Sequence, residues 1–254
     1  MSILEAIGLG ALQGVTEFLP ISSSGHLVIG QHLLGIAVPG NAFEIWVHLG
    51  TLLSILVVFR KKILSLLSTV SRTDTRRYIG FLIAGTVPAV VIGLGFRETL
   101  EGWFDSIGIV SAGLAVTGLL LFLTKAISPK PAEITLKIGI IIGFAQALAI
   151  VPGISRSGAT IAAALCMGVS SKDAAQFSFL LAIPAIAGAG ILTALDAVQY
   201  QETALSLPMI LSGLITSFGV GWISLRWLLA IIQQGKLYWF GTYCIAVGVI
   251  LFFS

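Results

Sequence analysis

The sequence predicts an all-α polytopic membrane protein built as an inverted-topology repeat, each half a re-entrant helical hairpin plus three transmembrane helices. Three observations support this prediction. Hydrophobic residues make up 57% of the 254 residues and charged residues only 10%, whereas soluble domains carry about 25% charged residues. Basic residues gather in a few loops, and a serine- and glycine-rich motif occurs twice.

The first expected element is a hairpin over residues 3–36 whose tip reads TEFLPISSSGH. The N-terminus lacks the basic region of a cleavable signal, so we expect this segment to be retained. Pro20 is expected to stop the first helix because proline lacks an amide donor. Gly25 permits a tight turn or a close approach, and the serines can cap the next helix.

Six further apolar runs are long enough to span a bilayer, which takes about 17–25 residues. They cover residues 43–59, 78–96, 107–124, 176–195, 207–228 and 237–253. Twelve of the fourteen basic residues flank these runs on one side: Arg60, Lys61, Lys62, Arg72, Arg76, Arg77, Lys125, Lys130, Lys137, Lys172, Arg226 and Lys236. The positive-inside rule makes that side cytoplasmic. The acidic loops near residues 98–105 and 196–202 then face outward.

This topology requires a second hairpin over residues 138–168, because both of its flanks are cytoplasmic. About 30 residues are too few for two spans, so the segment is expected to turn partway through the bilayer, at AIVPGISRSGAT. Pro152 is expected to stop its first helix, as Pro20 does in the first hairpin.

A shift of 133 residues aligns the two hairpins, and it pairs Gln13 with Gln146, Ser22 with Ser155, Ser24 with Ser157 and Gly25 with Gly158. Three spans follow each hairpin, and three is odd, so the halves are expected to be inverted. We therefore predict one integral membrane domain over residues 1–254. Repeat one covers about 1–130 and repeat two about 131–254.

The two polar tips are expected to line one enclosed site, since backbone that leaves a helix in hydrocarbon needs protein or water partners. Helix N-termini, serine hydroxyls and Arg156 together predict an anion site. Ionisable residues within a membrane are functional candidates, and these are Glu17, His26, Arg156, Glu44 and His48. The alternatives are a polar network that only pins the hairpins together and, for Glu44 and His48, contact with interfacial water.

Four other residues receive structural interpretations. Glu5 and His32 are expected at the membrane interface. Cys166 and Cys244 lie far apart in apolar surroundings, which favours buried thiols over a disulfide or a metal site.

The residue types at the tips suit phosphate chemistry. A carboxylate such as Glu17 can hold Mg²⁺ or Ca²⁺, Arg156 can stabilise charge on a phosphoryl group, and histidine can exchange protons near neutral pH. Ser23, next to these groups, could be a nucleophile or only a hydrogen-bonding group. The residues predict an anionic substrate at mid-membrane and leave open whether it is hydrolysed or transported.

Three long stretches carry a family resemblance: QGVTEFLPISSSGHL, FAQALAIVPGISRSGATIAAALCMGVS and FSFLLAIPA. With FEIWVHLGTLLSILVVF and GTVPAVVIGLGF they make the chain resemble, over nearly its whole length, undecaprenyl-diphosphatase, the bacitracin-resistance integral membrane phosphatase family. The resemblance implies hydrolysis of undecaprenyl diphosphate to the monophosphate and inorganic phosphate, with a divalent cation. It also implies a role in cell-wall synthesis and an active site facing the outer side of the inner membrane.

The resemblance also assigns roles to residues. The family's acidic motif falls on Gln13 and Glu17, and its second motif on Pro152, Gly153, Ser155, Arg156, Ser157, Gly158 and Thr160. The expected catalytic residues are Glu17, Ser23, His26 and Arg156, with Glu17 also holding Mg²⁺ or Ca²⁺. The expected substrate-binding residues are Gln13, Ser22, Ser24, Gly25, Ser155, Ser157, Gly158 and Thr160.

Gln13 departs from the glutamate of many members of the family, so Glu17 keeps the only carboxylate of a two-carboxylate metal site. Glu44 is the other group that the sequence offers for the cation. The expected partners are a polyprenyl diphosphate and membrane lipid, with no nucleic acid, and bacitracin would compete by binding the substrate. A homodimer stays open, and the rival function is a secondary transporter or lipid flippase for an anion.

Overall fold

The computed structural model describes residues 1–36, 42–104, 106–126, 132–199 and 205–253. Its helices are α1 (Ile3–Thr16), α2 (Ser23–Leu34), α3 (Ala42–Val58), α4 (Arg60–Ser68), α5 (Thr73–Gly95), α6 (Arg97–Trp103), α7 (Ile107–Leu123), α8 (Leu136–Leu148), α9 (Arg156–Cys166), α10 (Ser171–Gln199), α11 (Leu207–Gln233) and α12 (Tyr238–Phe252). A short 3₁₀ helix covers Thr124–Ala126. Within the described ranges, the β structure is limited to an isolated bridge between Ala132 and Val169.

The six predicted spans all fall on helices: α3, α5, α7, α10, α11 and α12. Three helical stretches, Thr73–Gly95, Ser171–Leu192 and Leu207–Gln233, are long and apolar enough to cross a membrane. α3 continues into α4 across a bend of 69°, and α7 and α12 are apolar but shorter. Many large apolar side chains on these helices are exposed, including Leu119, Ile215 and Trp227, as expected where lipid is the solvent. The chain is an all-helical, multi-pass membrane protein.

Two helix pairs are interrupted by short breaks. α1 and α2 are separated by residues 17–22, and α8 and α9 by residues 149–155. The first arms end at Thr16 and Leu148, each four residues before a proline. The amide that would bond to the carbonyl of the last helical residue is the one that Pro20 or Pro152 lacks, so the helix ends agree with the prediction that these prolines stop them.

The predicted serine caps are confirmed. The Ser22 hydroxyl accepts a hydrogen bond from the backbone N–H of Gly25 at 3.3 Å. The Ser155 hydroxyl does the same for Gly158 at 3.1 Å. Each cap satisfies one of the free amides at the start of its helix.

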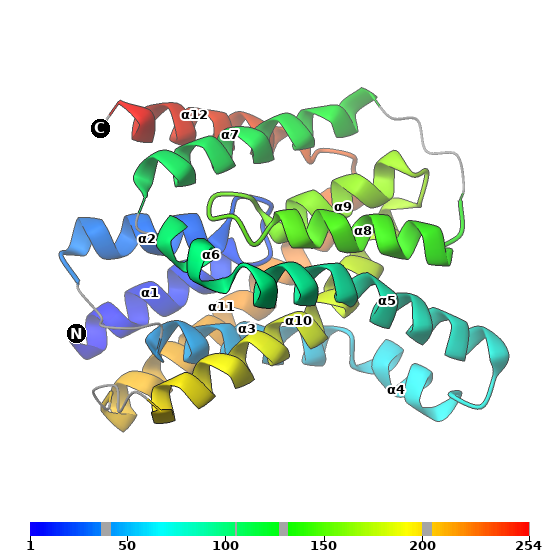
Figure 1. Cartoon of the computed structure of the whole chain (residues 1–254), viewed down its shortest axis with the longest axis horizontal. Coiled ribbons are helices and arrows are strands. Elements are labelled where there is room, and N and C mark those ends of the chain that lie inside the picture. Colours follow the sequence, from blue (N-terminus) through cyan, green and yellow to red (C-terminus); the bar gives the residue numbers. More distant parts are fainter. Residues whose placement is uncertain (37–41, 105, 127–131, 200–204, 254) are drawn as a thin grey trace.

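The helices pack so that each hairpin lies against a span from the other half of the chain. α1 packs on α11 and α8 packs on α5, while α3 lies against α10 and α11, and α7 against α12 (Figure 1). Glycines allow the closest of these approaches. A Cβ added to Gly10 would lie 2.7 Å from the carbonyl oxygen of Gly213, and one added to Gly143 would lie 2.2 Å from that of Gly85.

The two cysteines differ. Cys244 is buried, as predicted, whereas Cys166 is exposed in the last turn of α9, so that prediction was wrong. An apolar sequence context does not bury a side chain when it lies on the open side of a helix end. Asp105, Lys130 and Glu202, which were used to predict the topology, lie outside the described residues.

Candidate active site

The two breaks meet near the centre of the molecule, where the loop after α1 faces the loop after α8 (Figure 1). The Glu17 carboxylate forms an ion pair with the Arg156 guanidinium through Oε1 and Nη2. A Cβ added to Gly158 would lie 3.2 Å from the Pro20 Cβ. The Ser157 hydroxyl donates to the Leu19 carbonyl oxygen at 3.4 Å. Residues 139 positions apart therefore build one site.

Glu17 is the centre of this site. It follows α1 directly, and its side chain is only 6% exposed. Its Oε2 atom accepts hydrogen bonds from the Gln13 amide at 3.0 Å and from the Ser23 hydroxyl at 2.6 Å. The Nε2 atom of His48 lies 3.8 Å from the same oxygen. Gln13 reaches Glu17 because residues four apart share a helix face, and Ser23 reaches it because the chain turns back after the break.

Arg156 begins α9 and carries a donor that no group in the described part of the chain uses. Nη2 pairs with Glu17, whereas Nη1 is buried without a hydrogen-bond partner. A buried charged donor left unpaired costs free energy, and a guanidinium suits two-pronged contacts with phosphate oxygens. The arginine can therefore hold the carboxylate and an anion at the same time.

The serines of the two tips form matched pairs. The Ser22 and Ser24 hydroxyls lie 3.3 Å apart, and those of Ser155 and Ser157 lie 3.2 Å apart. Gly25 and Gly158, the glycines of the two tips, lie in the first turns of their helices. Their role is close approach, since a Cβ added to Gly25 would lie 3.2 Å from the Val110 side chain and one added to Gly158 would lie 3.2 Å from the Pro20 Cβ atom.

Thr160 supports the turn that carries Arg156. It is fully buried, and its hydroxyl donates to the Arg156 carbonyl oxygen at 2.7 Å and contacts the Ser178 hydroxyl. Sequence reasoning had placed this hydroxyl on the substrate and had missed Ser178. A lone serine in the apolar stretch FSFLLAIPA carries no signal of its own.

His26 is buried and both of its ring nitrogens have partners. Nδ1 lies 2.7 Å from the Ser22 carbonyl oxygen, which can only accept, so Nδ1 donates. Nε2 lies 2.8 Å from the Tyr243 hydroxyl, and in the neutral ring it accepts from that group. Tyr243 comes from α12 and stacks on the imidazole with ring centroids 5.7 Å apart. The sequence gives no signal for this tyrosine, because a single aromatic residue in an apolar helix is common.

Glu44 and His48 have different surroundings. The Glu44 carboxylate accepts from the Gln31 amide at 3.4 Å, whereas His48 approaches Glu17. The His48 Nδ1 atom lies 2.7 Å from the Glu44 carbonyl oxygen. The histidine rather than the glutamate of this pair faces the centre of the site.

A divalent cation fits the donors around Glu17. The Gln13 Oε1 atom is buried without a partner, and a half-turn of the amide would bring it to the Nε2 position, 3.0 Å from Glu17 Oε2. Neighbouring oxygen ligands of Mg²⁺ lie about 3 Å apart. The residues that the structure describes contain no cluster of three or more His, Cys, Asp or Glu. Such a cation would therefore depend on Glu17 together with neutral donors.

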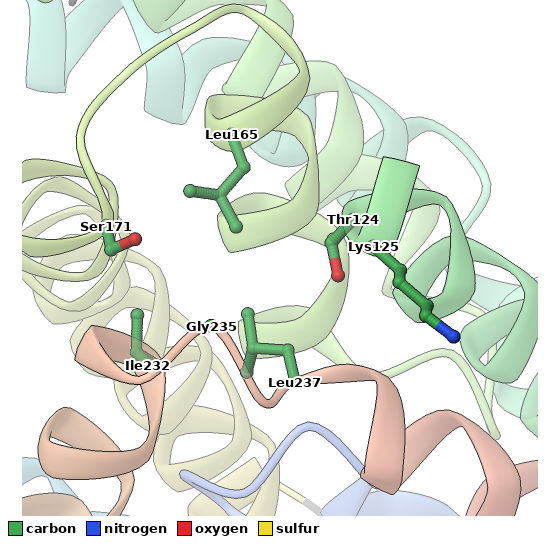
Figure 2. A pocket seen from close by; sticks show the side chains of 7 residues that line it. All are labelled: Thr124, Lys125, Leu165, Ser171, Ile232, Gly235 and Leu237. Carbon is green, nitrogen blue, oxygen red and sulfur yellow. The ribbon is translucent and has the colours of Figure 1, made fainter. Parts of the chain in front are cut away.

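A cavity of about 200 Å³ lies elsewhere, near the ends of α7, α9 and α11 and the starts of α10 and α12 (Figure 2). Thr124, Lys125, Leu165, Ser171, Ile232, Gly235 and Leu237 line it. The Lys125 side chain points away from its centre in Figure 2, and its ammonium lies over the Tyr238 ring at 5.2 Å. None of these residues belongs to the site around Glu17.

The chain is similar to curated proteins over nearly its whole length. An undecaprenyl-diphosphatase of Desulfosudis oleivorans is 41% identical over 267 residues, which cover 98% of this chain and 97% of that protein. Those of Desulforapulum autotrophicum and Korarchaeum cryptofilum are each 40% identical, and each alignment covers 98% of this chain and at least 97% of the relative. The family model described as bacitracin resistance protein BacA matches residues 6–250, so the chain belongs to that family, as its motifs predicted.

Proposed function

We propose that the protein hydrolyses undecaprenyl diphosphate to undecaprenyl phosphate and inorganic phosphate, at the outer side of the bacterial inner membrane. The relatives that cover the whole chain carry the name undecaprenyl-diphosphatase. The observation that carries the proposal is the contact of Glu17 with Ser23 on one side and Arg156 on the other. Carboxylate, hydroxyl and guanidinium are the groups that a phosphoryl transfer needs.

We further propose that the two halves are inverted repeats, with α1, α2, α3, α5 and α7 equivalent to α8, α9, α10, α11 and α12. The packing supports this. α1 lies on α11 as α8 lies on α5, and α3 lies on α11 as α10 lies on α5. Gly10 and Gly143, which both lie close to a glycine of another helix, are 133 residues apart, and the same shift aligns the two tips. A repeat of this kind brings two breaks to one midplane site.

In the reaction, Arg156 binds the diphosphate through its unused Nη1 donor and compensates the charge that develops on the phosphoryl oxygens. The free amides of the first turns of α2 and α9 are suited to the same anion. The prenyl tail stays among the apolar spans, and the headgroup lies between the tips. Attack on the terminal phosphorus breaks its bond to the bridging oxygen, and the lipid monophosphate is the leaving group.

Glu17 is the group best placed to accept the proton released by the attacking oxygen. The Ser23 hydroxyl already donates to it at 2.6 Å, whereas the nitrogens of His26 are engaged by Ser22 and Tyr243. The nucleophile is then a water activated beside Ser23, which gives inorganic phosphate directly, or Ser23 itself. In the second case a water must afterwards hydrolyse the phosphoserine to release phosphate and restore the hydroxyl. His26 holds the Ser22 carbonyl and so orients the turn that carries Ser23.

A divalent cation next to Glu17 and Gln13 would neutralise the diphosphate and polarise its terminal phosphoryl group. Gln13 contributes a carbonyl oxygen in place of a carboxylate, so this site carries one negative charge fewer than a pair of glutamates.

The test is release of inorganic phosphate from undecaprenyl diphosphate by the purified protein in detergent, with and without a chelator. We expect release that stops on chelation and resumes when Mg²⁺ or Ca²⁺ is added. A protein that moves the lipid across sealed liposomes but releases no phosphate in detergent would be a carrier, and the proposal would fail.

A further inference from the structure

We propose that His48 is a nitrogen ligand of the cation site beside Glu17. The inference rests on the proposed function only in assuming that the cation beside Glu17 exists. It assigns a role to a residue that lies outside both sequence motifs.

The orientation of the His48 imidazole supports this assignment. His48 Nδ1 lies 2.7 Å from the Glu44 carbonyl oxygen, and a carbonyl can only accept a hydrogen bond, so the proton of the neutral ring is on Nδ1. The Nε2 atom then presents a lone pair toward Glu17 Oε2, 3.8 Å away. A histidine that binds a metal commonly donates its other N–H to a backbone carbonyl in this way.

The distance between His48 Nε2 and Glu17 Oε2, 3.8 Å, also suits a bound ion. A neutral Nε2 and a carboxylate oxygen repel each other unless a proton on Nε2 makes them an ion pair or a metal ion lies between them. Metal bonds to nitrogen and oxygen of about 2.1–2.3 Å together span up to about 4.4 Å. One ion can therefore bind Glu17 Oε2 and His48 Nε2 at once.

The atoms around this gap can supply further ligands. The Gln13 Oε1 atom is buried and has no partner among the described residues, and a half-turn of its amide would exchange it with the N–H that now donates to Glu17 Oε2. Arg156 pairs with the other oxygen, Oε1, so the cation would share Oε2 only with the Ser23 hydroxyl. His48 is 32% exposed, which leaves room for water and substrate oxygens to complete the coordination.

The proposed ligands combine oxygen atoms with one imidazole nitrogen. Carboxylate and amide oxygens suit Mg²⁺, Ca²⁺ and Mn²⁺ alike, whereas an imidazole suits transition ions better than Mg²⁺ or Ca²⁺. Mn²⁺ can bind both kinds of donor and is paramagnetic, so it is the probe that can reveal a nitrogen ligand.

The test is Mn²⁺ binding to the full chain, purified without a histidine tag, stripped of metal and free of substrate. Pulsed electron paramagnetic resonance detects ¹⁴N coupled to bound Mn²⁺, and the chain has only three histidines. We expect imidazole coupling in the parent protein and in His32→Gln, whose histidine is exposed on α2. The coupling should disappear in His48→Gln.

The affinity provides a second readout. Loss of a ligand should weaken Mn²⁺ binding by more than about tenfold in both His48→Gln and His48→Ala, with a smaller change for Mg²⁺. An unchanged elution profile and melting temperature show that the variant is folded, and Gln preserves a side chain of similar size if Ala does not fold. Persistent nitrogen coupling in His48→Gln, or an unchanged Mn²⁺ affinity, overturns the inference.

The two proposals fail separately. If the parent protein releases phosphate from the lipid but its Mn²⁺ spectrum shows no nitrogen coupling, only the role of His48 is wrong. If it binds Mn²⁺ with nitrogen coupling and releases no phosphate, the hydrolase proposal is wrong and the ligand assignment stands.

Discussion

The break after α1 begins with the carboxylate of Glu17, whereas the break before α9 is followed directly by the guanidinium of Arg156. They also differ in backbone geometry. Ser22 caps α2 with a φ of 70°, the one positive value for a non-glycine residue within the described ranges, while its counterpart Ser155 has an ordinary φ of −73°. The positive φ of the second break falls on Gly153, at 90°, where no side chain resists it.

The breaks are also held differently. The buried Thr117 hydroxyl accepts from the backbone N–H of Ser155 and donates to the Gly153 carbonyl oxygen, both at 2.9 Å. In the first break, the Ser22 carbonyl oxygen accepts from His26 at 2.7 Å, whereas the Pro20 carbonyl oxygen accepts from the weak thiol donor of Cys244 at 3.5 Å. Strain in a non-glycine residue costs about 1–3 kcal/mol and tends to gather at functional sites. The first break thus has the features of a reactive element, and the second those of a rigid anion cradle.

Removing the positive charge of Arg156, which follows the second break, should have the largest effect on phosphate release. Arg156→Ala should lower kcat/KM for phosphate release by about 10²–10³-fold or more, because it removes the donor of the phosphoryl oxygens and leaves Glu17 buried without its cation. Arg156→Lys should recover only part, because an ammonium lacks the guanidinium fork. Arg226→Ala, whose side chain lies over Trp222, is the matched control, and equal rates in all three variants would contradict the assignment.

Removing the hydroxyl of the first break should come next. Ser23→Ala should reduce phosphate release by about 10²-fold or more if Ser23 supplies the attacking oxygen or directs a water to Glu17. Acid quenching during turnover, followed by mass spectrometry, distinguishes these cases, because only a serine nucleophile leaves a phosphoserine at position 23. Ser68→Ala, in exposed α4, serves as the control, and a fully active Ser23→Ala would remove this residue from the mechanism.

The difference in anchoring should appear as stability. Thr117→Val leaves a buried N–H and a buried carbonyl without their partner, and we expect it to lower the free energy of unfolding by about 2 kcal/mol. Cys244→Ser keeps a donor for the Pro20 carbonyl and should change it much less. Thermal unfolding in detergent measures both, and similar melting temperatures would mean that the two breaks are anchored alike.

The smallest effect is expected when His26 loses the hydrogen bond to the Tyr243 hydroxyl. Tyr243→Phe removes the hydroxyl partner of Nε2, while the aromatic ring retains its stacking contact. If His26 acts by holding the turn that carries Ser23, kcat should fall by about tenfold or less, by analogy with other outer-shell partners, with little change in KM. A loss as large as that of Arg156→Ala would instead make His26 a direct participant in the chemistry.

Much of this arrangement could be predicted from the sequence. Apolar runs placed the six spans on helices, and the charged loops required two hairpins, because hydropathy and charge act residue by residue along the chain. Serine caps were predicted at the tips for the same reason, since a cap bonds to an amide three residues away, and the structure identifies Ser22 and Ser155 as those caps.

The partners of these residues were not predictable in the same way. Tyr243, Ser178 and Thr117 stand in apolar helices with no motif around them, and their roles arise only where helices pack. Cys166 was expected to be buried and is exposed, and Thr160 uses its hydroxyl within its own helix. From the sequence, His48 was a candidate only together with Glu44. In the structure the two side chains have different partners, because His48 approaches Glu17 and Glu44 accepts from Gln31.

The sequence by itself determined the membrane class, the helical segments, the two polar tips and the family, because each depends on composition or on residues near one another in the chain. The tertiary structure alone decided that Glu17 meets Arg156, that Ser23 and His48 face the same carboxylate oxygen, and that Tyr243 holds His26. Apart from that of Ser23, which is six residues from Glu17, these contacts join elements far apart in sequence, and only the packing of helices brings such groups together.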